Sequence, residues 1–274
     1  MTHIFDPGYS QQPFKALVGS YPGASVYHAK DFRIEWGPLF HRGRLDGSAR
    51  ILLIGQDPAV EEAITRRILV GGAGHRIQGF LAKLGFARQY VMVNTFLYSL
   101  AQQQGGKTHV SDASIAAYRH QWLDALFAGS NVEAVVALGS LAHTAWQEYR
   151  ATASGAALTV TYQHITHPTQ PVSASHHSET LLKSLTKTML HEWNAALDVL
   201  KASIVHPESS IALKHYGDDF LATELVEIPE EDLPPGLPDW MRSADVWGSR
   251  VSADGSTRAA IQVTIPPSGR LWTT

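Results

Sequence analysis

Cysteine is absent from the 274-residue sequence, and its absence excludes several kinds of site. Without thiols the chain can form no disulfide, no thiolate zinc site and no iron–sulfur cluster. The sequence also has no run of eighteen apolar residues, so we expect no transmembrane helix and no membrane partner. Residues 1–10 lack the basic start and the apolar stretch of a secretory signal. These absences favour a cytoplasmic protein.

Metal-binding patterns are also missing. The chain has fourteen histidines, but no two of them have the HxxxH or HExxH spacing of a metal site. The glycine-rich residues 71–74 do not directly follow an expected strand, so they are a weak match to a dinucleotide-binding loop. We therefore expect neither a metal ion nor a cofactor.

Acidic residues are absent from a long internal stretch. Residues 63–111 contain no Asp or Glu and have six basic side chains: Arg66, Arg67, Arg76, Lys83, Arg88 and Lys107. A stretch of one charge sign beside a site can bind a polyanion, although solvated helix faces give the same pattern.

The net charge differs between two parts of the chain. Residues 205–274 hold eleven acidic residues and five Lys or Arg, a net charge of −6, whereas residues 1–204 have a net charge of +3. This contrast predicts an α/β body over residues 1–204 and an acidic appendage over residues 205–274.

The appendage has a β pattern near its end. Residues 246–251 and 259–265 are strand-like, and Asp254-Gly255 between them is typical of a hairpin turn. We expect a small β appendage that packs on the body through aromatic side chains, namely Trp240, Trp247 and Trp272.

Strand and helix patterns alternate along the body. Strand patterns occupy residues 50–55, 90–94, 132–138 and 158–165, and the first three contain short apolar runs. Helical patterns occupy residues 75–84, 111–127, 140–149 and 179–200. Continuous apolar runs are typical of strands buried on both faces, and their alternation with helices predicts a parallel sheet. We therefore predict an α/β fold, a three-layer αβα domain with a four-stranded parallel sheet.

Each expected strand ends in polar residues, which are Gln56-Asp57, Asn94, Gly139-Ser140 and His167. The carboxyl ends of parallel strands meet at one edge of a sheet, where ligands bind. Taken singly, Asp57, Asn94 and His167 are also ordinary turn or cap residues. Their common position at strand ends predicts one site.

The ordered motifs resemble the uracil-DNA glycosylase superfamily. Gly-Gln-Asp-Pro at residues 55–58 resembles the first signature motif of the classical members, and residues 93–97 resemble their base-reading strand. His-Pro-Thr at residues 167–169 is similar to their His-Pro-Ser motif. Residues 69–74 and 137–140 resemble segments of the thermophile-type and covalent uracil-binding branches. The resemblance covers residues 45–200 and implies a uracil-DNA glycosylase-like fold.

The resemblance implies an enzyme that hydrolyses the N-glycosidic bond of uracil in DNA, as in base excision repair. It assigns Asp57 to positioning water, His167 to stabilising the departing uracil and Asn94 to reading the base. Gly55 is expected to contact the base as well, and Gln56 is expected to contact either the uracil or the phosphate. The expected partners are single- or double-stranded uracil-containing DNA and, as product, free uracil. We expect a monomer that associates with the nucleoid.

The sequence departs from the family pattern at three places. Ala59 stands where classical members have a Tyr that excludes the thymine methyl group, and Leu69 stands where a Phe stacks on the base. Residues 170–173, Gln-Pro-Val-Ser, replace the Ser-Pro-Leu segment that wedges into DNA. The base-stacking and intercalating residues therefore stay open.

Several residues are candidates for contact with the DNA backbone. Hydroxyl, imidazole and basic side chains suit phosphates, which gives Arg66, Arg67, Arg76, Lys107, His109, Ser140 and Thr169. Residues 105–109 lie where the covalent branch has a basic loop whose His attacks the sugar, but they lack its arginine pair. His109 thus leaves two alternatives open: an ordinary loop residue, or the nucleophile of a protein that binds uracil-containing or abasic DNA tightly or covalently and turns over poorly. A third alternative is a small-molecule nucleotide-binding protein.

Overall fold

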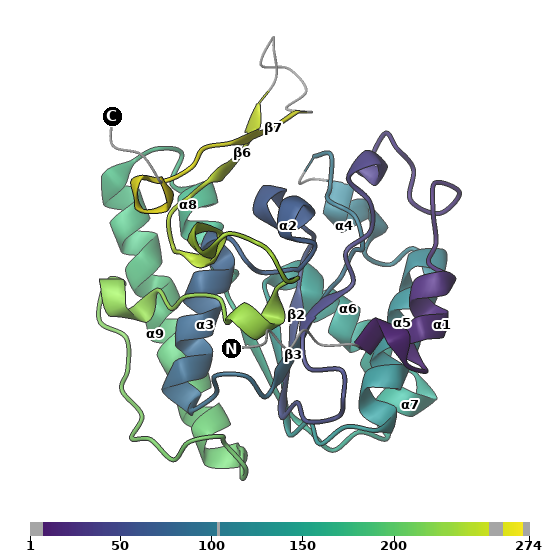
Figure 1. Ribbon diagram of the computed structural model, residues 1–274. Helices are drawn as coiled ribbons and strands as arrows, with labels where there is room; N and C mark the ends of the chain where they lie inside the picture. Colours follow the sequence, from purple (N-terminus) through teal and green to yellow (C-terminus); the bar gives the residue numbers. More distant parts are fainter. Residues whose placement is uncertain (1–7, 103–104, 252–259, 271–274) are drawn as a thin grey trace.

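A five-stranded sheet forms the centre of the computed structural model, which describes residues 8–102, 105–251 and 260–270 (Figure 1). The strands are β1 (His41–Gly43), β2 (Ile51–Gly55), β3 (Tyr90–Asn94), β4 (Ala134–Leu138) and β5 (Thr161–Ile165). Their order is β1–β3–β2–β4–β5. The four longer strands are parallel, which confirms the predicted α/β sheet. The additional edge strand, β1, is antiparallel to β3.

Helices cover both faces of the sheet, which gives the expected three layers (Figure 1). They are α1 (Phe14–Gly19), α2 (Val60–Thr65), α3 (Gly72–Leu84), α4 (Gly105–His109), α5 (Ala113–Ala128), α6 (Ser140–Arg150), α7 (Ala153–Ala156), α8 (Gln170–Ala174) and α9 (Glu179–Ser203). Short 3₁₀ helices η1 (Gly8–Ser10) and η2 (Ile34–Trp36) belong to the N-terminal part. Among the described residues, no helix has the length and apolar character needed to cross a membrane.

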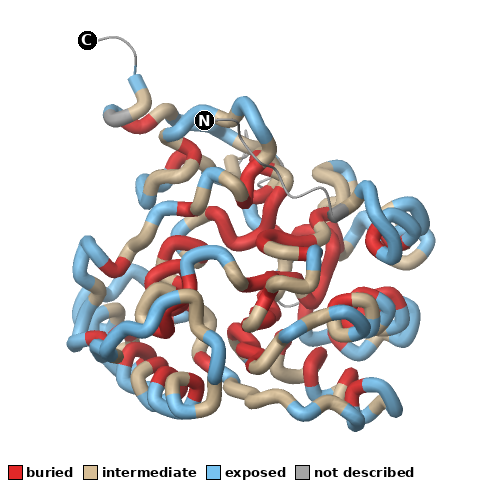
Figure 2. Tube along the Cα trace, turned by 60° about the horizontal axis from the view of Figure 1, so that its bottom comes forward, coloured by how far each residue is buried: buried red, intermediate tan, exposed pale blue. Residues whose placement is uncertain are grey.

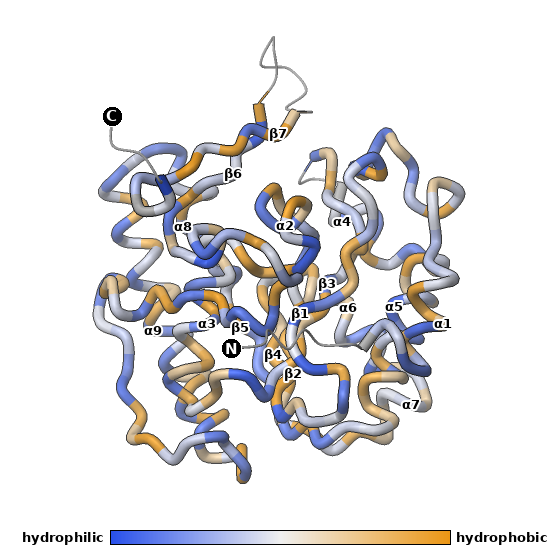
Figure 3. Tube along the Cα trace, in the orientation of Figure 1, coloured by the Kyte–Doolittle hydropathy of each residue, from blue (hydrophilic) through white to orange (hydrophobic). Residues whose placement is uncertain are grey.

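The core divides into two clusters because successive strand residues point to opposite faces of the sheet. Leu52 and Ile54 of β2 belong to the cluster that contains residues of α5 and α6. Ile51 and Leu53 belong to the cluster that contains residues of α3 and α9. All four side chains are buried, as are most residues in the central strands. Figure 2 colours the trace by burial, and Figure 3 colours it by hydropathy, with apolar residues in orange. Burial on both faces explains why the strands appear in the sequence as uninterrupted apolar runs.

The register of the parallel strands aligns their carboxyl ends. Gly55 at the end of β2 pairs with Asn94 at the end of β3, and Leu138 of β4 pairs with Ile165 of β5. Helices α2, α4 and α8 follow these ends and lie toward the same side of the molecule, the top of Figure 1. The polar residues after the strands therefore share one edge.

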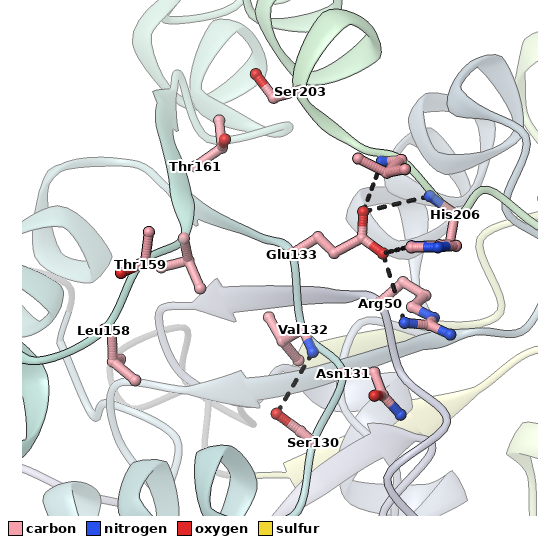
Figure 4. A pocket seen from close by; sticks show the side chains of 12 residues that line it. Arg50, Ser130, Asn131, Val132, Glu133, Leu158, Thr159, Thr161, Ser203 and His206 are labelled. Carbon is pink, nitrogen blue, oxygen red and sulfur yellow. Dashed lines mark hydrogen bonds and ion pairs between the residues drawn. The ribbon is translucent and has the colours of Figure 1, made fainter.

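The opposite edge of the sheet anchors the chain after α9. The Glu133 carboxylate, directly before β4, accepts hydrogen bonds from the Val205 backbone N–H at 2.6 Å and from His206 Nδ1 at 2.8 Å. It also pairs with Arg50 at 3.5 Å (Figure 4). These groups line an open cavity of about 730 Å³. The Glu133 carboxylate therefore holds the start of the C-terminal segment at this edge of the sheet.

The C-terminal segment, residues 204–270, has little regular structure before its final hairpin. Its elements are η3 (Ala222–Glu224), η4 (Glu230–Asp232), η5 (Asp239–Arg242), β6 (Gly248–Val251), β7 (Ala260–Val263) and η6 (Pro267–Gly269). Strands β6 and β7 form the expected antiparallel pair. Trp240 and Trp247 pack edge to face, with ring centroids 5.5 Å apart. Asp254-Gly255 and Trp272 lie outside the described residues, and the division of the chain at residue 204 stays a prediction.

A buried carboxylate joins this segment to the body. Asp232 of η4 accepts hydrogen bonds from Arg42 Nη1 at 3.0 Å and from the Tyr90 hydroxyl at 2.6 Å, and it pairs with Arg44. The side chains of Arg42 and Asp232 are completely inaccessible to solvent. Burial, together with the adjacent Asp232 charge, raises the pKa of Tyr90 well above its ordinary value. Among the described residues, the buried guanidinium of Arg42 pairs with Asp232, so it gains this counter-charge only when the C-terminal segment is in place.

Replacing Asp232 should therefore destabilise the whole protein. We expect Asp232→Ala to lower the free energy of unfolding by about 3–5 kcal/mol, because it leaves Arg42 buried without a counter-charge. Urea denaturation measures the effect. Asp239→Ala, in the same segment at a side chain 97% exposed, serves as the control and should change stability by less than about 0.5 kcal/mol. An equal effect of the two substitutions would refute this account.

Candidate active site

A cleft of about 810 Å³ lies at the carboxyl edge of the sheet. The loop after β2, the start of α6 and the loop after β5 form its walls, together with α9 and β6. Six of the residues predicted from sequence line it: Gln56, Asp57, Ala59, Ser140, His167 and Thr169. The structure thus brings the two predicted catalytic groups, Asp57 and His167, into one cavity.

The Asp57 carboxylate is held by two donors. Its Oδ2 accepts a hydrogen bond from the Leu100 backbone N–H at 2.9 Å, and its Oδ1 accepts one from Gln56 Nε2 at 3.1 Å. Burial raises the pKa of Asp57, while the Leu100 N–H and the Arg250 charge oppose that rise. The carboxylate is therefore oriented, and its ionised form depends on these partners.

His167 is held as a neutral imidazole with a defined tautomer. The Thr169 backbone N–H lies 3.3 Å from His167 Nδ1 and can only donate, so Nδ1 is the acceptor and the proton is on Nε2. Thr169 Oγ1 also lies 3.1 Å from Nδ1. Burial and then the charge of Arg76 lower the pKa of His167 to about 4. Arg76 is fixed nearby because it donates to the Pro168 carbonyl.

Gly139 lets the ends of β4 and β5 approach each other. It has φ of 85°, in the left-handed region, and a Cβ on it would lie 3.1 Å from the Cβ of His167. It precedes α6, whose first residue, Ser140, is exposed in the cleft. The start of α6, where backbone N–H groups lack partners within the helix, therefore lines the cavity together with His167.

Asn94, Gly55 and Leu69 lie together beside the loop after β2. A Cβ on Gly55 would lie 2.3 Å from Asn94 Oδ1 and 3.7 Å from Leu69 Cδ1, so only glycine leaves room for the amide. Asn94 Nδ2 is buried, and no acceptor for it is found among the described residues. A buried amide donor without an acceptor is costly unless a ligand supplies one. Asn94 thus has a donor available for a polar group, although Asn94, Gly55 and Leu69 do not line the cleft that holds Asp57 and His167.

Glu62 is a site residue that the sequence analysis missed. Its carboxylate accepts hydrogen bonds from the Ala59 backbone N–H and, at 2.6 Å, from the Leu69 backbone N–H. Leu69 has φ of 53°, which is unfavourable for a branched side chain and is stabilised by this bond. Burial raises the pKa of Glu62 to about 7. A Glu in the third position of α2 is the capping pattern that could have revealed it.

The other predicted DNA-contact residues do not line the cleft. Arg66 donates to the carbonyls of Trp36 and Pro38, each at 2.7 Å, and the side chain of Arg67 is buried. Lys107 is exposed on α4. His109, expected in a loop, instead lies in α4 with its ring between Asp112 Oδ2 at 2.6 Å and Asp31 Oδ2 at 3.2 Å.

Arg250 of β6 is the second residue that the sequence analysis missed and, unlike Glu62, it lines the cleft. It comes from the acidic C-terminal segment, and nothing in the local sequence pattern indicates that it reaches residues 150 positions earlier. No group of three or more His, Asp or Glu able to hold a metal ion occurs in the described part of the chain.

Comparison with protein families gives a match over the body of the molecule. A family model described as the Uracil DNA glycosylase superfamily matches residues 42–201. The matched region runs from β1 through nearly all of α9 and contains Asp57, Asn94 and His167. Arg250 and the C-terminal segment lie outside it. A search of curated proteins finds no match for the chain.

The state of His167 can be tested by titration. We expect its imidazole to remain neutral, with the proton on Nε2, until the pH falls to about 4. An unfolded His takes up its proton near pH 6.5, so the stability contributed by neutral His167 is lost as the pH falls from about 6.5 to about 4. Nitrogen-15 NMR reports the tautomer, and His167→Asn should flatten the dependence of unfolding free energy on pH in that window. Protonation of His167 above pH 6 would contradict the assignment.

Proposed function

The chain belongs to the uracil DNA glycosylase superfamily, and we propose that it hydrolyses the N-glycosidic bond of uracil in DNA as a monofunctional glycosylase. The observation that carries this proposal is the pairing, in one cleft, of an oriented carboxylate, Asp57, with a neutral imidazole, His167. The proposal assigns the protein to base excision repair of DNA damage.

His167 is assigned to the departing base. As the glycosidic bond breaks, negative charge develops on the uracil ring, and a hydrogen bond to its O2 stabilises that charge. Neutral His167 has a proton on Nε2 for this purpose, because Nδ1 is occupied as the acceptor of the Thr169 N–H. A preorganised donor of this kind is worth roughly 10²–10³ in rate.

Asp57 is assigned to the sugar and the water. The sugar gains positive charge as the bond breaks, and an ionised carboxylate stabilises that charge while it orients the attacking water. The hydrogen bonds from Leu100 and Gln56 hold the carboxylate in one direction before substrate binds. The rate should therefore fall when the pH drops far enough to protonate Asp57, whose pKa is raised by burial.

Asn94 is assigned to base recognition. Its Nδ2 can donate to uracil O4, and its Oδ1 can accept from N3–H. Cytosine has the reverse arrangement, an amino donor and an N3 acceptor, and would leave buried groups unpaired. The lack of an acceptor for Asn94 Nδ2 in the described part of the chain supports this role. Gly55, Gln56, Ala59 and Leu69 complete the proposed base-binding region.

DNA contact at the cleft requires that the target nucleotide leave the helical stack. Ser140 at the start of α6 and Thr169 at the start of α8 are proposed phosphate contacts on its wall. Arg76 and Lys107 are proposed to act at longer range through their charge. Uracil-containing DNA, single- or double-stranded, is the proposed substrate, with the protein acting as a monomer.

Substitution of the two catalytic candidates tests the proposal. We expect Asp57→Asn and His167→Ala each to lower the rate of uracil release by roughly 10²–10⁴, because each removes a group that acts in the transition state. The measurement is alkali-induced cleavage of a uracil-containing oligonucleotide. Asp239→Asn and His191→Ala, at exposed positions outside the cleft, are the matched controls and should retain full activity.

Two outcomes would overturn this function. One is wild-type protein that leaves no alkali-labile site in uracil-containing DNA. The other is a covalent protein–DNA adduct on a denaturing gel that disappears in His109→Ala, which would favour the binding protein with poor turnover. The position of His109, between Asp31 and Asp112 and outside the cleft lining, gives no support to the covalent alternative.

A further inference from the structure

The β6–β7 hairpin lies over α2 (Figure 1), and Arg250 of β6 lines the cleft. The backbone N–H groups of Trp247 and Gly248 both donate to Glu61 Oε1 of α2 at 3.4 Å. A Cβ on Gly248 would lie 2.8 Å from Glu61 Cγ, so the hairpin and the helix are in close contact. The hairpin is therefore fixed against the helix that follows the Asp57 loop.

Arg250 extends from this hairpin into the cleft wall. Its Nη1 donates to the Leu100 carbonyl at 3.3 Å, and its Nη2 donates to Ser99 Oγ at 2.5 Å. The guanidinium also lies over the Trp36 ring, 5.0 Å from the centroid. Three contacts on three sides give the planar guanidinium one orientation.

Leu100 connects Arg250 to Asp57. The carbonyl of Leu100 accepts from Arg250, and the N–H of the same residue donates to Asp57 Oδ2 at 2.9 Å. A shift of the Ser99–Leu100 backbone would therefore move the donor that orients the carboxylate. The chain of contacts joins two parts of the protein that are 193 positions apart, Asp57 and Arg250.

Arg250 also supplies charge. Among the described residues that line the cleft, it is the one Arg or Lys. Its positive charge favours the ionised form of Asp57, against the burial that disfavours it. The other ionisable groups around this carboxylate are Glu62 and Glu61 of α2 and, across the cleft, His167 and His164. None of these has the permanent positive charge of Arg250.

We propose that Arg250 is a positioning residue: it fixes Leu100, and through it Asp57, so that the C-terminal hairpin completes an active site whose other parts lie within residues 42–201. This inference rests on the proposed function for its catalytic consequence. Its structural consequence, the pH at which the Asp57 carboxyl group ionises, can be measured without catalysis.

The first experiment follows the Asp57 carboxyl group directly. In full-length protein labelled with ¹³C in aspartate side chains, the Asp57 signal is identified by its loss in Asp57→Asn and is titrated with pH. We expect Arg250→Gln to raise its midpoint by about one pH unit, since an adjacent opposite charge lowers a carboxyl pKa by about 1–3 units. Arg270→Gln removes the same charge from the same segment, outside the cleft lining, and should leave the midpoint unchanged.

The second experiment measures kcat and KM on uracil-containing DNA. We expect Arg250→Gln to lower kcat about tenfold or more with little change in KM, and to move the acid side of the pH profile upward. Arg250→Lys keeps the charge and should recover most of the pH profile. Ser99→Ala removes one anchor without touching the Arg and should give a smaller loss of the same kind. In an Asp57→Asn background, Arg250→Gln should have no further effect on kcat.

Two results would overturn the inference. One is an unchanged Asp57 midpoint in folded Arg250→Gln protein, which counts against it even if the wild-type protein releases no uracil. The other is a rise in KM, with kcat and the pH profile unchanged and a weaker salt dependence of DNA binding. That pattern would make Arg250 a phosphate contact instead. Absence of uracil release together with the expected midpoint shift would reject the proposed function alone.

Discussion

The parallel pairing of β2 with its neighbours β3 and β4 is the constraint on which the site depends. Backbone hydrogen bonds fix Gly55 beside Asn94, and the paired ends of β4 and β5 bring Gly139 close to His167. Asp57 and His167 each lie only two residues beyond a strand end, and both line the cleft. The two-sided core keeps this register, because a slip of one residue would move every strand side chain to the wrong face.

Buried carboxyl groups connect separate segments of the chain around that sheet. Asp57 is held by a backbone N–H of Leu100, Glu62 holds the N–H groups of Ala59 and Leu69, and Asp232 pairs with Arg42. Each carboxylate joins segments that are distant along the chain or curve sharply. Removing an ionised group from water is costly, so each one is retained only where its partners compensate for the lost hydration. The loop that carries Asp57 therefore also depends on Glu62, a carboxyl group outside the cleft lining.

Sequence patterns predicted the sheet, its main helices and the cluster of Gln56, Asp57 and His167, because strand ends converge whatever the loops contain. They did not predict β1, whose three residues are too few for a period. They also could not distinguish a basic residue near the site from a buried one. Arg76 lies next to His167, whereas the side chain of Arg67 is buried, yet both are basic residues in the same stretch of sequence. Glu62 carried a local capping pattern. Arg250 has no local sequence pattern that marks it, because its proposed role arises from a tertiary contact with Leu100.

The placement of Asp232 has a consequence for how the protein is made. During synthesis, the residues that match the family emerge from the ribosome before the carboxylate that neutralises Arg42. A nascent chain that has reached α9 thus contains every strand of the sheet, yet one of its innermost positions is a cation without its counter-ion. Burial of Arg42 against its counter-charge therefore has to wait for the C-terminal segment. A residue that is synthesised after the whole sheet, Asp232, thus completes the interior around Arg42.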